Sequence, residues 1–498
     1  MCGFVCLWKI DDPALARRMI DKIAHRGPDE LQVRQEPNVP AVMAHCRLSI
    51  IGPADGSQPI YGSDNVLVAN GEIYNYADLR AILGESAFET KSDSETILHL
   101  FRSGALRWIA KLDGMFAFVL ATPDRIIAAR DPLGIKPLFM ARIGDGLAFA
   151  SELKAFDGLG IETIEAIEPG TLYDSREGFR EWYRMPQGAA ELTPHEHVEP
   201  IAHELRLVLE AAVRKWMVAD VEVGSFLSGG LDSSVIAALA ARNLDRPLKT
   251  FSVGLEGSPD LVAARAVSEH IGSEHYELPF TVEDLAEVLP HVVYHLESAD
   301  VDLVRSALPT HFATTLARRH VKAVLTGEGA DELFAGYAYH HAYANRPRAL
   351  ADELTRALGT MHNINLQRVD RITMAQGLEA RTPFLDRELI DFAQSIPAAL
   401  KMKIDPEAGV TTEKWILRKA CEDLLPHDLI WRKKAQFDEG SGTVDALDRA
   451  LMMLTGSATP LNREEEGALY ERLLRDQYAE PDFILANAGM WADSRIAV

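Results

Sequence analysis

FLSGGLDSS, residues Phe226–Ser234, is the stretch that decides the fold of most of this 498-residue chain. The apolar run Val221–Leu227 leads into it and is typical of a buried strand, whereas the alanine-rich run VIAALAARN that follows is typical of a helix. A strand that enters a helix through a short glycine loop indicates a parallel sheet, whose ligands bind at the carboxyl ends of the strands. We therefore expect a binding site at this loop.

The loop has the chemistry of a phosphate site. Free backbone N–H groups and the helix dipole favour an anion at the start of a helix. Asp232 would repel phosphate unless Mg²⁺ lay between them, so Asp232 is a candidate metal ligand. The loop lacks the lysine of a Walker sequence, and a serine-rich helix cap is the alternative interpretation. The remaining candidates for phosphate binding are Ser228, Gly229, Gly230, Ser233 and Ser234.

A second loop, TGEGADE at Thr326–Glu332, follows the apolar strand predicted at Val321–Thr326. Strands and helices alternate between Ile201 and this loop, which predicts a parallel sheet with helices on both faces. The two loops then meet at one edge of the sheet. Three carboxylates so close together repel one another unless cations are present. An exposed acidic turn is the alternative, and we favour a functional loop because glycines flank Glu328 and the loop would face Ser228. The helices and further strands expected here are Ile201–Met217, Lys249–Leu255, a helix from Pro259, Glu274–Leu278, a helix from Val282, and Pro309–Arg319.

A basic run, WRKKAQF at Trp431–Phe437, is a third candidate. By itself it is more typical of a solvated face. It gains interest because a site that adenylates a substrate needs a cation beside the leaving pyrophosphate. Arg381 and Lys414 are weaker candidates of the same kind.

The first half of the chain consists of short β-type runs separated by turn residues, with helical segments at Pro13–Ile23 and Ser94–Gly104. This pattern predicts a packed antiparallel arrangement. Met185–Pro200 is polar and proline-rich, so we interpret it as a linker between domains at residues 1–184 and 201–498. The expected strands of the first half are Gly3–Trp8, Ala41–Ile51, Asn65–Ala69, Met115–Ala121, Arg125–Ala129 and Gly146–Ala150.

Cys2 would become the first residue once Met1 is removed. Its α-amine, with a pKa of about 7.7–8.0, could then act as a base for its own thiol. Arg47 could bind a carboxylate, Asn70 and Gly71 could form an oxyanion hole, and Asp93 could hold a substrate ammonium. The alternative is that Cys2 is simply a small residue at the start of a strand.

The composition excludes several classes of protein. The formal net charge is −23, from 51 Lys+Arg and 74 Asp+Glu, which argues against broad nucleic-acid binding. The chain contains no apolar stretch near the length of about 20 residues that spans a bilayer, and its N-terminus does not resemble a signal peptide. The four cysteines match neither a zinc pattern nor a disulfide scaffold. We expect a soluble, cytoplasmic protein with reduced thiols.

Further motifs accompany these sites along the chain. In order, they are MCGF, HRGPD, HCRLSI, NGEIYN, SD (Ser92–Asp93), ARDPLGIKPLF, ASELKA, FLSGGLDSS, TFSVGLEGSPD, TGEGADELFAGY, EARTPFLD, EKWILRKA and WRKKAQF. The ordered set resembles that of the glutamine-hydrolysing asparagine synthetases, and the FLSGGLDSS loop is similar to the pyrophosphate loop of ATP pyrophosphatases. The resemblance implies an α+β N-terminal nucleophile hydrolase sandwich followed by an α/β parallel-sheet ATP-pyrophosphatase domain with a helical C-terminal part.

The resemblance also implies roles for individual residues. Cys2 would be the glutaminase nucleophile, Asp232 and Asp331 would hold Mg²⁺, and Glu328 and Lys434 would assist formation of aspartyl-AMP. The glutamine pocket would comprise Arg47, Ile50, Ile51, Asn70, Gly71, Glu72 and Asp93. Leu227, Val253, Thr326 and Gly327 would join the phosphate loop in binding ATP.

The small-molecule substrates implied are L-glutamine, L-aspartate and ATP, with a homodimer as one prediction for assembly. Thr326 and Ala330 occupy positions where relatives more often carry serine, and the segment after Tyr343 is compact. Two related activities are therefore kept as alternatives, namely amidation of another carboxylic acid and closure of a β-lactam ring. An intact Cys2 speaks against the latter, and the full set of site residues speaks against a non-catalytic paralogue.

Overall fold

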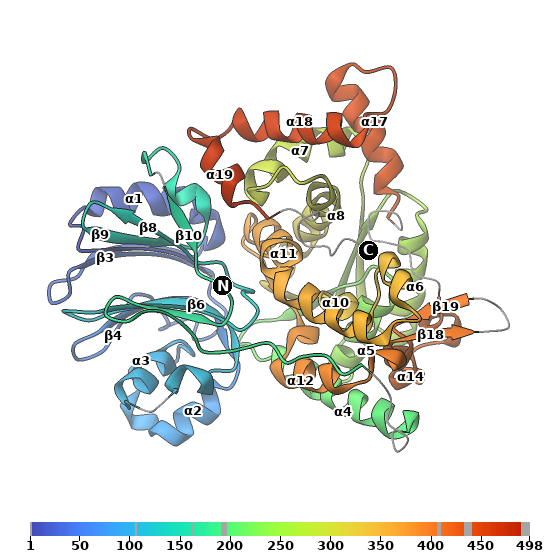
Figure 1. Ribbon diagram of the computed structural model, residues 1–498, viewed down its shortest axis with the longest axis horizontal. Coiled ribbons are helices and arrows are strands. Elements are labelled where there is room, and N and C mark those ends of the chain that lie inside the picture. The colour runs from blue at the N-terminus through green and yellow to red at the C-terminus, as the bar shows by residue number, and fades with distance from the viewer. Residues whose placement is uncertain are drawn as a thin grey trace.

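The computed structural model describes residues 2–104, 107–161, 163–190, 197–405, 410–432 and 441–489. Figure 1 shows two stacked sheets in the N-terminal half and a mixed helical and sheet half beside them. Both N-terminal sheets are six-stranded and antiparallel, as the sequence predicted. The first has the order β10(Ile164–Ala166), β8(Phe139–Ile143), β9(Gly146–Ala150), β1(Cys2–Trp8), β3(Ala41–Arg47), β2(Glu30–Gln35). The second has the order β12(Gly178–Glu181), β11(Thr171–Asp174), β7(Ile126–Arg130), β6(Gly114–Ala121), β5(Val66–Ile73), β4(Ile60–Tyr61).

β1 is buried on both faces, which explains its continuous apolar sequence. Phe4 and Cys6 point between the two sheets, while Val5 and Leu7 point outwards against α1(Pro13–Asp21). On the outer face of the second sheet lie α2(Tyr76–Leu83) and α3(Glu95–Arg102). The predicted strand at Asn65–Ala69 ended too early, because β5 continues through Asn70 and Gly71 to Ile73.

The C-terminal half contains the predicted parallel sheet. Its order is β15(Glu274–Pro279), β14(Lys249–Gly254), β13(Val223–Phe226), β16(Ala323–Leu325), β17(Glu379–Arg381). The edge strand β17 was not predicted, because three residues are too few to show a period. A separate antiparallel hairpin is formed by β18(Met402–Asp405) and β19(Val410–Glu413). No described helix is both long and apolar enough to cross a bilayer.

Helices cover this sheet and fill the rest of the half. They include α4(Val198–Trp216), α5(Leu231–Ala241), α6(Pro259–Ile271), α7(Val282–Leu296), α8(Val301–Ala317), α9(Ala330–Phe334), α11(Asn365–Met374) and α14(Trp415–Ala420). The remaining α-helices of the described residues are α10(Pro347–Thr360), α12(Arg387–Ser395), α13(Ala398–Lys401), α15(His427–Ile430), α17(Thr443–Thr455), α18(Arg463–Arg475) and α19(Pro481–Asn487).

Two helix starts differ from the prediction. α8 begins near Val301 rather than at Pro309, because the Asp300 side chain accepts a hydrogen bond from Leu303 N at 2.9 Å and caps the helix there. Pro309 lies inside the helix. α4 begins at Val198, so its first turn takes up the last residues of the predicted linker.

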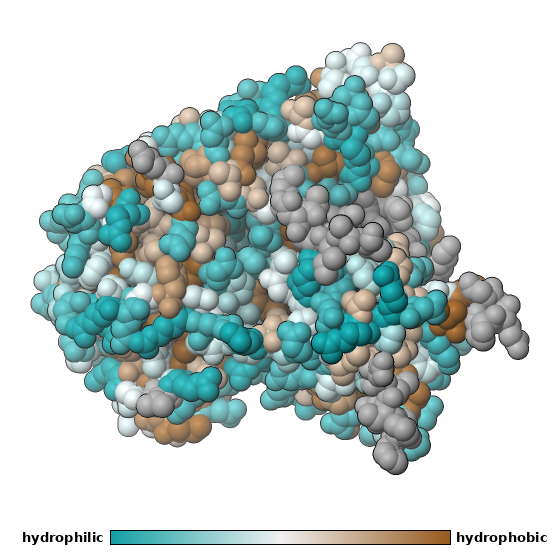
Figure 2. Space-filling model, viewed as in Figure 1, coloured by the Kyte–Doolittle hydropathy of each residue, from teal (hydrophilic) through white to brown (hydrophobic). Residues whose placement is uncertain are grey.

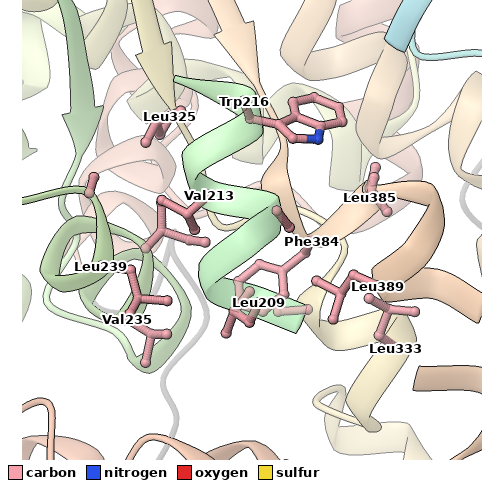
Figure 3. Packing of buried hydrophobic residues seen from close by; sticks show 14 of the residues in the cluster. Leu209, Val213, Trp216, Val235, Leu239, Leu325, Leu333, Phe384, Leu385 and Leu389 are labelled. Carbon is pink, nitrogen blue, oxygen red and sulfur yellow. The ribbon is translucent and has the colours of Figure 1, made fainter. Parts of the chain in front are cut away.

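Two apolar clusters organise the core. In Figure 3, Leu209, Val213 and Trp216 of α4 lie among Leu239 of α5 and Phe384. The second cluster crosses between the halves, since Val5 and Leu7 of β1 belong to the same packed group as Leu285 and Leu289 of α7. Figure 2 shows hydrophilic residues over much of one face, with apolar residues in small patches among them.

Candidate functional site: two centres joined by a buried interface

Cys2 lies at the start of β1, directly opposite Arg47 of β3 in the strand register. Its backbone N–H donates to Asn70 Oδ1 at 3.1 Å. The residue is buried, and burial raises the pKa of its thiol above the usual value. A protonated thiol is a poor nucleophile, so this cysteine needs a local base before it can attack.

Asn70 and Gly71 lie on β5, beside Cys2. Asn70 is fully buried, and its Nδ2 has no hydrogen-bond partner among the described residues. Gly71 has φ 136, and a Cβ there would lie 1.9 Å from the Met115 carbonyl oxygen, so no other residue fits. An unused amide donor next to the thiol suits the stabilisation of an oxyanion.

Arg47 is held in place by backbone carbonyls of the loop that follows it. Its Nη2 donates to Gly52 O at 2.6 Å and to Ile51 O at 3.3 Å. Ile50 and Ile51 are buried in the same loop. The guanidinium is therefore fixed beside Cys2, where it can bind a carboxylate.

Two acidic side chains complete this first centre. Asp93 accepts a hydrogen bond from Ile73 N at 2.6 Å, and burial raises its pKa to about 6. Burial also raises the pKa of Glu72 well above its usual value, and the nearby Glu379 and Asp93 carboxylates add to this effect. The structure thus brings together every residue predicted for the glutamine pocket.

The second centre lies at the carboxyl ends of β13 and β16. Ser228 and Ser233 cross the phosphate loop with their hydroxyl oxygens 3.0 Å apart, and Ser228 N donates to Ser233 Oγ at 3.1 Å. A Cβ on Gly327 would lie 2.8 Å from Asp232 Cβ, so glycine allows the second loop to pack directly on the first. The two loops meet as predicted.

Between the loops lies a cavity of about 480 Å³, a size typical of sites for small molecules. Of the residues predicted to bind ATP, all line it except Gly229 and Ser234. Predicted residues that line it are Leu227, Ser228, Gly230, Asp232, Ser233, Val253, Thr326, Gly327, Glu328 and Asp331. Ser234 is instead buried within α5.

Lys414 provides a cation at the point where the predicted metal ligands meet. Its Nζ lies 2.5 Å from Asp232 Oδ2 and 2.5 Å from Asp331 Oδ1. Although burial alone would lower the pKa of Lys414, the two carboxylates raise it. Asp232 Oδ1 is buried and has no hydrogen-bond partner within the described ranges.

The carboxylates of Asp232 and Asp331 suit a divalent cation, because both lie beside Lys414 Nζ and so are close to each other. Mg²⁺ is commonly bound by one or two carboxylates together with substrate phosphates. Across the described part of the chain, no group of three or more His, Cys, Asp or Glu side chains could hold a metal without such help.

Glu328 is paired with Arg368 of α11, whose Nη2 lies 2.6 Å from Glu328 Oε1. Nearby, burial raises the pKa of Glu332 to about 7, with the Asp331 carboxylate adding to the effect. Lys434 lies outside the described residues. The start of its basic run is described, and Arg432 Nη1 donates to Gly229 O in the phosphate loop at 3.1 Å.

Arg381 was predicted as a weak candidate for the cation near phosphate, and this prediction is wrong. Its side chain turns towards the first centre, where Nη2 lies 3.8 Å from Glu72 Oε2. Its backbone oxygen accepts a hydrogen bond from Thr326 N at 2.8 Å. Sequence reasoning also missed Arg368, which lies in a polar helix with no recognisable motif.

Comparison with known proteins agrees with both centres. A family model described as a glutamine amidotransferase domain matches residues 1–174, and one described as asparagine synthase matches residues 204–354 and 344–491. An Asparagus officinalis protein named asparagine synthetase [glutamine-hydrolyzing] is 40% identical over 467 residues, which cover 89% of this chain and 78% of that protein. The chain belongs to the asparagine synthetase family.

Other asparagine synthetases match over similar lengths. Asparagine synthetase [glutamine-hydrolyzing] 3 of Arabidopsis thaliana is 39% identical over 89% of this chain and 79% of its own length. The asparagine synthetase of Sandersonia aurantiaca is 39% identical over 89% of this chain and 87% of its own length. The glutamine amidotransferase match covers the first centre, and the asparagine synthase match covers the loops of the second.

Proposed function

We propose that this protein forms L-asparagine and L-glutamate from L-aspartate, L-glutamine, ATP and water, with release of AMP and diphosphate. One observation supports this most directly. A near-terminal cysteine beside an unused amide donor and a cavity between two phosphate-type loops occur in the same chain. The names of the similar proteins describe the same glutamine-hydrolysing synthesis.

In the first centre, Cys2 would attack the side-chain amide of glutamine. Once Met1 is removed, the Cys2 α-amine would take the thiol proton, a step made necessary by the raised pKa of the thiol. Asn70 Nδ2 and the Gly71 N–H would stabilise the oxyanion, and ammonia would leave. Water would then hydrolyse the thioester to glutamate.

The glutamine itself would be held by charge. Arg47 would bind its α-carboxylate, Asp93 would bind its α-ammonium, and Glu72 would line the same pocket. Ile50 and Ile51 would enclose the apolar part of the side chain.

In the second centre, the aspartate β-carboxylate would attack the α-phosphorus of ATP. Asp232 and Asp331 would hold Mg²⁺, which when bound neutralises charge on the phosphates. Lys414 and the predicted Lys434 would add positive charge near the leaving pyrophosphate, and Glu328 would act at the forming anhydride. Ammonia would then displace AMP from aspartyl-AMP.

We also propose the domain limits 1–184 and 201–498 and a cytoplasmic location. The family models and the start of α4 support a boundary near residue 198.

The proposed location is supported by the cysteines. All four cysteines are free, as expected in a reducing compartment. A homodimer stays a prediction.

A product assay with a panel of carboxylic acids tests the proposal. With ammonium, ATP and Mg²⁺ present, aspartate should give stoichiometric AMP and diphosphate. Diphosphate release with a different acid would keep the chemistry and replace the acceptor. ADP and phosphate as products would contradict the assignment of the FLSGGLDSS loop.

A further inference from the structure

α11 is buried along its whole length although more than half of its side chains are polar. Figure 1 places it between the two-sheet half and the half that contains the parallel sheet. A buried polar side chain is costly unless it finds a partner. The polar side chains of this helix have partners in both halves of the protein. Asp370 accepts a hydrogen bond from Arg26 of the N-terminal half. The donors of the helix bond within the C-terminal half, namely Asn365 to Glu332, Gln367 to Leu296 O, Arg368 to Glu328 and Thr310, and Arg371 to Glu297.

Asp370 makes a buried ion pair that crosses the domain interface. Arg26 Nη1 lies 2.8 Å from Asp370 Oδ2 and Arg26 Nη2 lies 3.1 Å from Asp370 Oδ1, a two-pronged pair. Both side chains are almost fully buried, at 0% and 3% exposure. Lys136 Nζ lies 3.4 Å from Asp370 Oδ1. Such a planar pair fixes the plane of the guanidinium as well as its position.

Arg26 also contacts the backbone of the proposed nucleophile, because its Nε donates to the Cys2 carbonyl oxygen at 3.0 Å. Arg26 Nη1 also lies 2.5 Å from Glu152 Oε1, so its charge is balanced from both domains. The Cys2 carbonyl carbon is bonded to the Cα that carries the α-amine and the thiol-bearing Cβ, so Arg26 holds the backbone from which both groups project.

The opposite side of α11 is anchored in the second centre. Arg368 precedes Asp370 by two residues, which places it roughly 200° around the helix. Its Nη1 donates to Thr310 Oγ1 at 3.1 Å and its Nη2 contacts Glu328. Asp370 is therefore presented to Arg26 by a helix that cannot rotate without breaking contacts in the ATP cavity.

We propose that Asp370 is a positioning residue of the glutaminase centre, supplied by the synthetase domain, and that it orients Cys2 through Arg26. This inference rests on the proposed role of Cys2 as nucleophile. It does not depend on the identity of the acceptor, because glutamate release from glutamine can be measured without ATP or aspartate.

The test is the full-length Asp370→Asn variant, which keeps the shape of the side chain and removes its charge. We expect kcat for glutamine hydrolysis to fall, by up to about 10²-fold. KM for glutamine should stay near the wild-type value, because Arg47, Glu72 and Asp93 are untouched. Ammonia-dependent diphosphate release should also be retained, which shows that the variant is folded. Asp370→Glu should recover part of the lost kcat.

Lys322→Gln is the matched control. Lys322 Nζ forms another ion pair across the interface, 2.6 Å from Asp29 Oδ2, and among the described residues its side chain pairs with no residue assigned to either centre. This variant should hydrolyse glutamine at the wild-type rate. The rate at which a diazo ketone analogue of glutamine alkylates Cys2 at saturation should fall in Asp370→Asn and not in Lys322→Gln.

Three results would overturn the proposal: an unchanged kcat in Asp370→Asn, an equal loss in Lys322→Gln, or equal losses of glutaminase and ammonia-dependent activities. A wild-type protein that hydrolyses glutamine but ignores aspartate would instead contradict the proposed acceptor alone. Glutamine hydrolysis that survives Cys2→Ala would contradict the proposed nucleophile.

Discussion

The Lys414 ammonium lies 2.5 Å from Asp232 Oδ2, beside the loop expected to bind phosphate. Lys414 also has a left-handed backbone, with φ 54, at the turn that starts α14. A lysine in this conformation is strained, and such strain tends to persist where function requires a fixed side chain. Lys414 also lines the cavity between the two loops, so we predict that its ammonium acts on the phosphates.

Lys414→Met should therefore impair the second centre alone. We expect ammonia-dependent asparagine synthesis to fall on the order of 10²–10³, while glutamine hydrolysis continues. Lys419→Met on the same helix is the control, because Lys419, within the described ranges, pairs with the half-exposed Glu422 at the surface and with no residue of the cavity. Diphosphate release at a near wild-type rate in Lys414→Met would show that this ammonium does not act on the phosphates.

Asp232→Asn should alter the requirement for metal. The amide keeps the size of the side chain but loses the charge that attracts Mg²⁺, so the Mg²⁺ concentration at half-maximal rate should rise. Glutamine hydrolysis serves as the internal control and should not change. An unaltered Mg²⁺ titration would mean that Asp232 is not a ligand.

Cys2→Ala should separate the two reactions. The thiol acts only in the first centre, so glutamine-dependent synthesis should be abolished while ammonia-dependent synthesis persists. A chain that retains Met1 should behave like the variant, because its Cys2 nitrogen is an amide and cannot act as a base. Parallel loss of both activities in a folded Cys2→Ala protein would contradict a two-centre enzyme.

Glutamine binding should weaken in acid because of Asp93. Burial raises its pKa to about 6, so the carboxylate that would bind the glutamine ammonium is lost as the pH falls through that value. KM for glutamine should then increase about tenfold for each further pH unit. In Asp93→Asn, KM should be high at every pH and should no longer follow this titration. The measurement is glutaminase KM between about pH 7 and 5.

Much of the second centre could be predicted because its signals are local. Glycine, serine and aspartate at fixed spacing after an apolar strand identify the loop at Ser228, whatever lies elsewhere in the chain. The three-residue β17 carries too little pattern for such reasoning. Arg26 and Asp370 are 344 residues apart, and no property of either segment indicates that they pair. Their contact is a consequence of how the domains dock.

Acid should also destabilise the fold through His45. This buried residue of β3 has its Nε2 3.2 Å from the Ala69 carbonyl oxygen, and burial lowers its pKa to about 3. The unfolded chain binds a proton near pH 6.5, whereas the folded chain does not until about pH 3. The contribution of the buried, neutral His45 to the free energy of unfolding is therefore full above about pH 6.5 and is lost as the pH falls towards 3.

Between about pH 6.5 and 3, protonation of His45 in the unfolded chain should lower the free energy of unfolding by about 1.4 kcal/mol per pH unit. Urea unfolding of the wild type and His45→Gln at several pH values isolates the effect, because all other groups titrate alike in both proteins. If the two proteins lose stability with the same slope, His45 is not held neutral by the fold.

The apolar cluster shared by Val5, Leu7, Leu285 and Leu289 limits how such a chain can be rearranged by recombination. Domains joined only by a tether can be exchanged between proteins as separate modules. Here, a glutaminase half taken from another gene would have to match α7 and α8 at every buried position and also balance the charges of Asp370 and Glu297. New pairings of the two halves would therefore require coordinated changes on both sides of the interface, and we expect the halves to be inherited together.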